Sequence, residues 1–388
     1  MLTVNSRILL VSRVPNCTYL PQRYHSAFFA TYPKVKMATS VKSNQTVTVF
    51  GAYGHTGRFV VKELLKRGLT PVLAGRSKEK LEAIGPTYPY LEIRPASVDN
   101  PEELDKALEG SMAVINCAGP FLDTAIPLIE AALRNRIHYL DMAAEQQCIL
   151  AAHERFSKEA CNKSIVILPG MGFYGGLADL LATAAMEGWT TADTINVGIA
   201  LDSWMPTVGT RLTGQRNTNR RLTFSNNALA FISDPLPTRK WDFAEPFGLQ
   251  EVQGFPLSEI ITISKHVQVN EINSYINLAP MQDIHNSNTP PPQPADESGR
   301  SSQIFLMEVI VRSGKNICRA MATGRDIYAI TAPLIVEAMA RIAEGLIKKT
   351  GVVSPGEVFD ATDFLKSLCP EYLSVDISAN QKESTTNR

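Results

Sequence analysis

The sequence predicts an α/β protein with an N-terminal, doubly wound parallel sheet and a second domain of α+β character. Apolar, strand-like runs alternate with helical periodicity from residue 46 to residue 168, which is typical of a parallel sheet. A glycine-rich turn follows the first of these runs. Beyond residue 176 the pattern changes to strands paired across short turns, which indicates a separate domain.

The glycine-rich turn lies in residues 47–58, which read VTVFGAYGHTGR. Its glycines let backbone N–H groups at the start of a helix approach a pyrophosphate, because any Cβ there would obstruct the approach. The apolar face of FVVKELLKRG indicates that helix. The combination predicts a Rossmann dinucleotide site, the alternative being an ordinary turn. The residues expected to bind the cofactor here are Gly51, Ala52, Tyr53, Gly54, His55, Thr56, Gly57 and Arg58.

The next strand, at 71–74, predicts which dinucleotide is bound. NAD sites normally carry a carboxylate at the end of this strand, but no Asp or Glu occurs between residues 66 and 78. Arg76 and Ser77 instead offer a planar cation and a hydroxyl to a 2′-phosphate. The sequence therefore predicts NADP(H) in preference to NAD(H). The alternative is that Arg76 is a solvated surface charge.

Further strands and helices follow in the order that a doubly wound sheet requires. One helix has an Asn cap, a Pro in its first turn and early acids, which together mark a helix start. In order, we expect a helix at 78–84, a strand at 91–95, a helix ending at 108, a strand and turn at 113–120, a helix at 124–135, a strand at 139–142, a helix at 146–161 and a strand at 165–168.

The turn within 113–120 should lie at the carboxyl edge of the sheet, where the nicotinamide would arrive. Ligands of such sheets bind outside the carboxyl ends of the strands, so we expect cofactor contact. The alternative is a plain turn in which Asn116 caps the following helix. The residues concerned are Asn116, Cys117, Ala118, Gly119 and Pro120.

Two carboxylates, Asp141 and Glu145, follow the fifth strand and are the catalytic candidates. Either could orient a substrate or relay a proton. Capping of the next helix would explain either residue equally well. No Cys or His spacing indicates a metal site, so none is predicted.

The second domain contains an unusual segment, 207–221, in which four arginines are interleaved with Thr, Asn and Gly. These arginines could clamp a carboxylate, a phosphate or the cofactor. The alternative is a solvated basic loop. The predicted substrate-binding residues are Arg211, Arg216 and Arg220.

The chain as a whole divides into five parts by composition and pattern. A long helix opening at 331 and running to about 349 is expected to pack back on the first domain. The expected parts are a disordered or transit-like extension at 1–43, the NADP-binding Rossmann domain at 44–175, an α+β substrate or dimerisation domain at 176–326 with a disordered Pro-rich insertion at 285–302, a C-terminal helical segment at 327–372 and a disordered tail at 373–388.

Composition limits the functional classes. The chain has 38 basic and 38 acidic residues, so no charge excess points to nucleic acid. No apolar run reaches the length of a membrane span. Residues 1–36 lack Asp and Glu and contain several basic residues, as in an organellar transit peptide. We favour a start at Met37 and a cytoplasmic protein, with mitochondria or another organelle matrix as the alternative.

A family resemblance rests on several motifs within 46–180. They are VTVFGAYGHTGR, Ala74-Gly75-Arg76, INCAGPF at 115–121, Tyr139-Leu140-Asp141 followed by Glu145, PGMGF at 169–173, and Asp179. This combination resembles the saccharopine dehydrogenase-like NAD(P)-binding oxidoreductases, a family that includes saccharopine reductase and trans-acting enoyl reductases. Ala144 stands where the family often has Gly, and 174–178 replaces a Ser/Pro-containing turn. The resemblance implies a class of chemistry and not a particular substrate.

We therefore expect an NADP(H)-dependent oxidoreductase that transfers hydride to or from a C=N, C=C or C=O bond of a small metabolite. A non-catalytic NADP(H)-sensing regulatory protein is one alternative. A trans-acting enoyl reductase on polyketide or lipid intermediates is another. The expected partner is a small-molecule substrate, and a homodimer is an open possibility.

Overall fold

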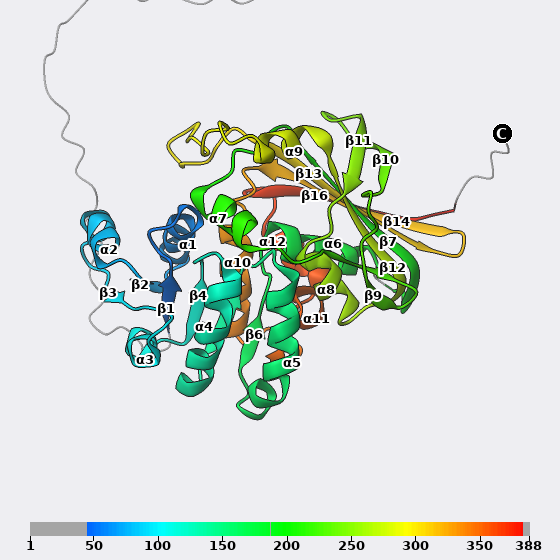
Figure 1. Ribbon diagram of the computed structural model, residues 1–388. Helices are drawn as coiled ribbons and strands as arrows, with labels where there is room; N and C mark the ends of the chain where they lie inside the picture. The colour runs from blue at the N-terminus through cyan, green and yellow to red at the C-terminus, as the bar shows by residue number, and fades with distance from the viewer. Residues whose placement is uncertain (1–44, 187, 383–388) are drawn as a thin grey trace, which may run out of the picture. The chain divides into compact units, whose positions relative to one another are not determined.

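The computed structural model describes residues 45–186 and 188–382. A seven-stranded parallel sheet, built from residues 46–168 and one strand at 351–352, forms what we call the first half of the structure. The strand order is β15-β6-β5-β4-β1-β2-β3 (Figure 1). This order is that of a Rossmann sheet extended at one edge, so the predicted fold class is confirmed. The strands are β1 (Thr46–Phe50), β2 (Thr70–Gly75), β3 (Ile93–Pro95), β4 (Ala113–Asn116), β5 (His138–Asp141), β6 (Val166–Leu168) and β15 (Gly351–Val352).

Helices cover both faces of this sheet, as the burial of its strands requires. One face packs on α3, α4 and α5 through a core that includes Leu104, Leu128 and Phe156. The other packs on α1 through Val60 and Leu64. The helices are α1 (His55–Lys66), α2 (Lys78–Ile84), the short η2 (Gly85–Thr87), α3 (Pro101–Leu108), α4 (Phe121–Asn135) and α5 (Gln146–Asn162).

The second half contains a nine-stranded mixed sheet. Strand β12 pairs in parallel with β7, whereas the other pairs are antiparallel. The β13–β14 hairpin, which turns at Ser313 and Gly314, is an example of the strands paired across short turns that the sequence predicts. The strands are β7 (Thr191–Leu201), β8 (Leu222–Ser225), β9 (Ala228–Phe231), β10 (Thr238–Asp242), β11 (Leu249–Gly254), β12 (Gln268–Asn277), β13 (Ile304–Ser313), β14 (Asn316–Arg325) and β16 (Leu373–Lys382).

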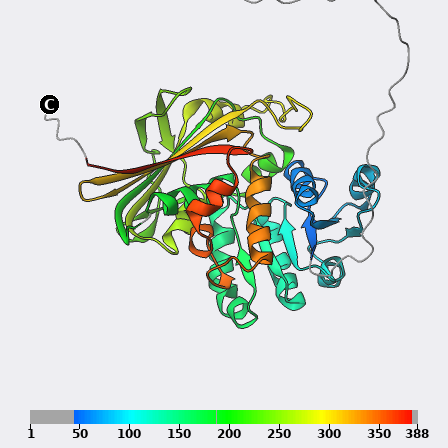
Figure 2. The same ribbon diagram turned by 180° about the vertical axis from the view of Figure 1, so that it is seen from behind.

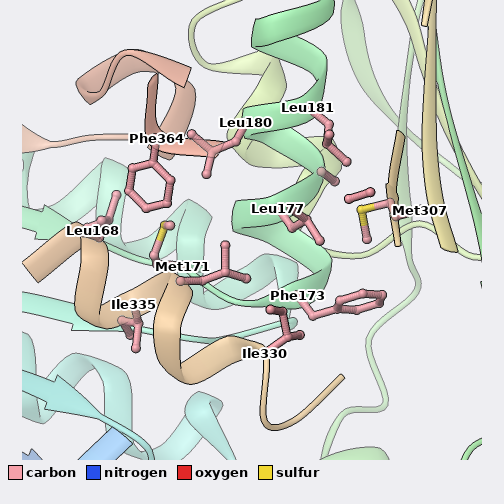
Figure 3. Close-up of a cluster of buried hydrophobic side chains, with 14 of the residues drawn as sticks. Leu168, Met171, Phe173, Leu177, Leu180, Leu181, Met307, Ile330, Ile335 and Phe364 are labelled. Carbon is pink, nitrogen blue, oxygen red and sulfur yellow. The ribbon is translucent and has the colours of Figure 1, made fainter. Parts of the chain in front are cut away.

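One hydrophobic core joins the two halves. Figure 3 shows Leu168 of β6 and Ile335 of α10 around the same cluster as Leu180, Phe364 and Met307 of β13. The boundary proposed at 175/176 therefore falls inside a shared core. The helices that accompany the nine-stranded sheet are η3 (Phe173–Leu177), α6 (Ala178–Ala185), α7 (Val208–Arg216), α8 (Ser258–Ser264) and α9 (Leu278–His285).

The C-terminal helices pack against the first half, as predicted. Helix α10 (Thr331–Ala343) lies against α1, which Figure 2 shows as an orange helix beside a blue one. It ends before the predicted residue 349 because Gly345 adopts a left-handed φ of 73°, which is typical of a helix stop. The remaining helices are α11 (Pro355–Val358) and α12 (Ala361–Ser367).

Two segments predicted to be disordered have defined structure. Residues 373–382 form β16, paired with β14, and the period-two pattern of Leu373, Val375 and Ile377 is its overlooked signal. Residues 286–303 lack helix and strand, but Arg325 Nη2 donates to Asp296 Oδ2 at 2.8 Å and holds the segment. The predictions for 1–43 and for 383–388 lie outside the described residues.

Among the helices of the described ranges, none combines the length and the apolar character needed to cross a bilayer.

Candidate functional site

A cavity of about 860 Å³ lies where β1 and β4 end. These neighbouring strands lead to helices on opposite faces of the sheet, and doubly wound sheets bind ligands in the crevice at this point. Four parts of the chain line the cavity: the glycine turn after β1, the end of β2, the loop after β4, and side chains from the second half.

The glycine turn has the geometry of a phosphate cradle. Gly51 adopts φ of +87°, and a Cβ there would lie 3.0 Å from Ala118 N in the loop after β4. A Cβ on Gly57 would overlap Gly51 O. Gly54 caps α1 without a side-chain hydrogen bond, and no acid occupies the first turn. The N-terminal N–H groups of α1 are therefore free to bind an anion.

Five of the eight residues predicted in this turn line the cavity. They are Gly51, Tyr53, Gly54, His55 and Thr56. The other three support the turn: Ala52 is fully buried, Gly57 allows close packing, and Arg58 Nε donates to Tyr53 O at 3.2 Å.

His55 is a half-buried ring at the edge of this turn. It packs edge-on against Phe59 and Tyr328. Burial lowers the pKa of His55, so its imidazole is neutral near pH 7. A neutral ring beside the phosphate cradle can donate one N–H hydrogen bond, but it adds no positive charge to that of the helix start.

The end of β2 presents two cations, Arg76 and Lys80, to the cavity. Neither belongs to an ion pair in the part of the chain that the structure describes. Lys80 Nζ lies 5.7 Å from the Tyr53 ring centroid. Sequence reasoning missed Lys80, which lies in the first turn of α2, just beyond its Ser77 cap. Ser77, predicted to bind the cofactor, instead caps α2 through Lys80 N.

No carboxylate lines this end of the cavity. Asp123 and Glu145 are the acids among the lining residues, and both belong to the α4–α5 side. A 2′-phosphate, which two free cations attract and a carboxylate would repel, therefore fits the end of β2.

Asn116 shapes the loop after β4 rather than lining the cavity. Its side chain is fully buried, accepting a hydrogen bond from Ala118 N at 3.0 Å and donating to Thr124 Oγ1 at 3.0 Å and Tyr139 OH at 3.2 Å. The loop bends as a result, and its next four residues line the cavity: Cys117, Ala118, Gly119 and Pro120. Burial raises the pKa of the Cys117 thiol far above its usual range, so no thiolate forms.

The two catalytic candidates have different environments. Asp141 is fully buried, accepts hydrogen bonds from Tyr139 OH, Ala143 N and Gly170 N at 2.7–2.9 Å, and does not line the cavity. Its carboxylate is saturated by these donors, so it is positioned to fix the turn after β5. Asp141 therefore does not face the cavity in which a substrate would lie.

Glu145 lies in the cavity wall at the start of α5. Its two oxygens accept hydrogen bonds from Phe121 N at 3.0 Å and Ala144 N at 3.1 Å. Burial raises the pKa of Glu145 to about 7, against the lowering effect of these bonds. A carboxyl group that is half protonated near neutral pH suits proton transfer.

The second half closes the cavity with an aromatic wall formed by Tyr174, Trp204, Phe255 and Tyr328. Helix α7 lies along its mouth. Thr210 Oγ1 lies 2.9 Å from Tyr328 OH, and Trp204 Nε1 donates to the same hydroxyl at 2.9 Å. The far end of α7 reaches the first half, where Arg216 Nε donates to Asp123 Oδ1 at 2.9 Å.

The predicted substrate-binding arginines are not brought together. Arg211 donates to the carbonyls of Asn286 and Thr289, and Arg216 pairs with Asp123. Neither Arg211 nor Arg216 lines the cavity. Of the three, Arg220 lines the cavity, with its guanidinium 4.3 Å from the Phe231 ring centroid. The neighbouring Arg221, which was not among the three, also lines the cavity.

Comparisons with known proteins agree with this geometry. Residues 47–165 match the saccharopine dehydrogenase NADP binding domain family. A saccharopine dehydrogenase-like oxidoreductase of Mus musculus is 30% identical over 187 residues, 42% of this chain and 43% of that protein. A probable mitochondrial saccharopine dehydrogenase-like oxidoreductase of Arabidopsis thaliana is 26% identical over 165 residues, 39% of this chain and 36% of that protein. The chain thus aligns with less than half the length of these curated relatives.

A likeness in fold extends further along the chain. Apo saccharopine dehydrogenase (L-Glu forming) of Saccharomyces cerevisiae superposes with a TM-score of 0.60 at 11% identity, covering 86% of this chain and all of that one. At this identity the likeness concerns the fold alone. Residues 47–165 thus match a saccharopine dehydrogenase NADP binding domain, and the fold likeness to saccharopine dehydrogenase extends over most of the chain.

Proposed function

We propose that the protein is an NADP(H)-dependent oxidoreductase that transfers hydride to or from a C=N, C=C or C=O bond of a small metabolite in this cavity. One observation carries the proposal: an uncapped, glycine-built helix start shares a cavity with two unpaired cations and a buried carboxyl group. The first two features suit a phosphorylated dinucleotide. The third supplies the proton that a reduction requires.

The residues take the following roles. The α1 start holds the pyrophosphate, while Arg76 and Lys80 hold the 2′-phosphate. Residues 117–120 border the nicotinamide, which supplies or accepts the hydride when the cofactor is bound. Glu145 Oε donates the proton to the reduced atom, or removes it in the reverse direction. The aromatic wall and α7 exclude water from the reacting groups.

All the residues invoked belong to one chain, so the proposal does not require the homodimer that the sequence left open. The cytoplasm stays the proposed location. An organelle matrix is the alternative, which the probable mitochondrial location of the plant relative favours.

The first test is a fluorescence titration of the protein with NADPH and with NADH, for the wild type and for Arg76→Glu. The substitution replaces a cation at the 2′-phosphate by a repelling carboxylate. We expect NADPH affinity to fall by about tenfold or more, equal to about 1.4 kcal/mol, and NADH affinity to change little.

Lys78→Glu is the matched control, because Lys78 is exposed, pairs with Glu82 and does not line the cavity. It introduces the same charge change two residues away and should leave the NADPH-to-NADH ratio as in the wild type. An unchanged ratio in Arg76→Glu would contradict the 2′-phosphate assignment. NADPH binding without turnover of any carbonyl, imine or enoyl compound would instead favour a non-catalytic sensor.

A further inference from the structure

The inner half of the cavity is apolar and aromatic. Ring centroids of Tyr174 and Trp204 are 5.6 Å apart, those of Tyr174 and Phe255 6.1 Å, and those of Trp204 and Phe255 5.9 Å. Leu257 continues this surface. Such a wall gains free energy by covering apolar substrate surface, and it offers little to a ligand with several charges.

A cation, Arg221, lies within this wall. Its guanidinium carbon is 4.2 Å from the Phe255 ring centroid, and burial lowers the pKa of Arg221. In the described part of the chain no carboxylate lies within ion-pair distance of Arg221. Stacking on Phe255 compensates only part of the cost of burying a charge.

The acid that influences Arg221 most is Glu259, and it is incompletely bonded as well. Glu259 is fully buried, and one oxygen accepts from Leu257 N at 2.9 Å. Its other oxygen has no hydrogen-bond partner among the described residues, nor has the hydroxyl of Tyr174. The Arg221 guanidinium and the Tyr174 ring thus lie on the same Phe255 ring, 4.2 Å and 6.1 Å from its centroid.

Gln146 fixes this group beside Glu145. The Gln146 amide donates to Leu222 O at 2.7 Å and Leu257 O at 2.9 Å, and its carbonyl accepts from Leu222 N at 2.7 Å. These three bonds hold Leu222, the residue after Arg221, and Leu257, two residues after Phe255, to the start of α5. An anion bound by Arg221 therefore lies on the same side of the cavity as the proposed proton donor.

We propose that Arg221 anchors the carboxylate of an amphipathic, singly charged substrate whose apolar body lies on Tyr174, Trp204 and Phe255. A carboxylate can take two parallel hydrogen bonds from the guanidinium, which neutralises the buried charge. A second charge on the part of the substrate that covers the aromatic wall would be unpaired there. The inference rests on the proposed function, since it names the substrate class for the same cavity.

The test uses octanoate as an anionic probe and octan-1-ol as its neutral counterpart. Binding is measured calorimetrically on the full chain, with and without saturating NADPH, for the wild type, Arg221→Gln and Arg221→Lys. We expect Arg221→Gln to weaken octanoate by about tenfold or more and octan-1-ol by less than about threefold. Arg221→Lys should restore part of the octanoate affinity, because a charge without the planar fork remains.

Arg239→Gln is the matched control. Arg239 is also an arginine stacked on aromatic rings, 5.3 Å from Trp241 and 5.4 Å from Tyr275, but it does not line the cavity. Its substitution should leave octanoate binding unchanged. The inference is overturned if wild type binds no octanoate, if Arg221→Gln binds it as wild type does, or if Arg239→Gln loses it equally.

The NADPH titration of the same variants separates the two proposals. Normal NADPH binding with no preference for octanoate overturns the substrate class and leaves the oxidoreductase proposal standing. Failure of wild type to bind NADPH overturns the proposed function, while octanoate binding without cofactor still decides the role of Arg221. Normal NADPH binding by Arg221→Gln also verifies that the variant is folded.

Discussion

Their neighbours distinguish the two carboxylates at and just after the end of β5. Asp141 and Glu145 are four residues apart and both buried, yet Asp141 is bonded by three donors inside the protein and Glu145 faces the cavity. The same comparison applies to the arginines, because Arg221 lines the cavity whereas Arg216 does not. A single side chain therefore owes its proposed role to which atoms surround it, more than to its type.

The pKa of Glu145, raised to about 7 by burial, leads to a pH prediction. A proton donor must be protonated, so the rate of substrate reduction should fall as pH rises through about 7. Glu145→Gln should lower kcat by about 100-fold or more and should abolish this dependence. The measurement is NADPH oxidation from pH 5.5 to 9 with any compound that wild type reduces. If the falling limb persists in Glu145→Gln, another group donates the proton.

Asp123→Asn serves as the comparison in that experiment. Asp123 also lines the cavity, but it is partly exposed and paired with Arg216. Asp123→Asn should leave the fall in reduction rate near pH 7 unchanged. The two variants together distinguish a buried donor from a general effect of removing negative charge.

At the scale of elements, the glycine turn depends on the close approach of α1 to β1. Gly57→Ala places a methyl group against Gly51 O, so α1 must move away from the strand. We expect the free energy of unfolding to fall by about 2 kcal/mol or more, and NADPH binding to weaken with it. Urea denaturation and the NADPH titration measure the two effects.

Gly85→Ala is the corresponding control. Gly85 has helical φ and ψ, and apart from its chain neighbour Pro86 a Cβ there would meet Ile93 Cδ1 at 3.4 Å. Proline disfavours a helical residue with a Cβ before it, so this change should cost about 1 kcal/mol, less than Gly57→Ala. Equal losses in both variants would mean that any added methyl near this sheet is harmful and that Gly57 has no special role.

Elements with strong local signals could be predicted from the sequence, and those that depend on distant contacts could not. Strands β1, β2, β4 and β5 follow apolar runs closed by turns. Helix α7 has no buried residue and little apolar pattern. Two hydrogen bonds hold it in place, one between the hydroxyls of Thr210 and Tyr328 and one from Arg216 to Asp123. These partners are more than 90 residues away in sequence, so no local pattern reveals the helix.

For the molecule as a whole, a charge network joins both ends of the described chain. Glu337 of α10 accepts from Arg67 of α1 and from Arg341 Nε at 2.7 Å. Arg341 also bonds Asp363 Oδ2 of α12 at 2.8 Å. The prediction that the C-terminal helices return to the first domain came from apolar periodicity. Apolar periodicity does not reveal which charged residues pair between these helices and α1.

Removal of Glu337 tests this link. Glu337→Ala removes the shared carboxylate of two largely buried guanidinium groups, although Arg67 keeps Glu63 and Arg341 keeps Asp363. We therefore expect unfolding to require about 2 kcal/mol less. Glu130→Ala, which breaks an exposed pair with Arg155, should cost less than about 1 kcal/mol. Urea denaturation of both compares the two costs. Similar small losses would show that apolar packing alone joins α10 to α1.

The position of β15 has a consequence for synthesis on the ribosome. Strand β6 ends at residue 168, but its outer neighbour begins at residue 351, so the sheet that holds the cofactor stays one strand short while the intervening chain is translated. A nascent sheet with an open edge is prone to pair with other chains. Cofactor binding by a growing polypeptide should therefore appear late, and ribosome-bound chains stopped before residue 351 should depend most on chaperones.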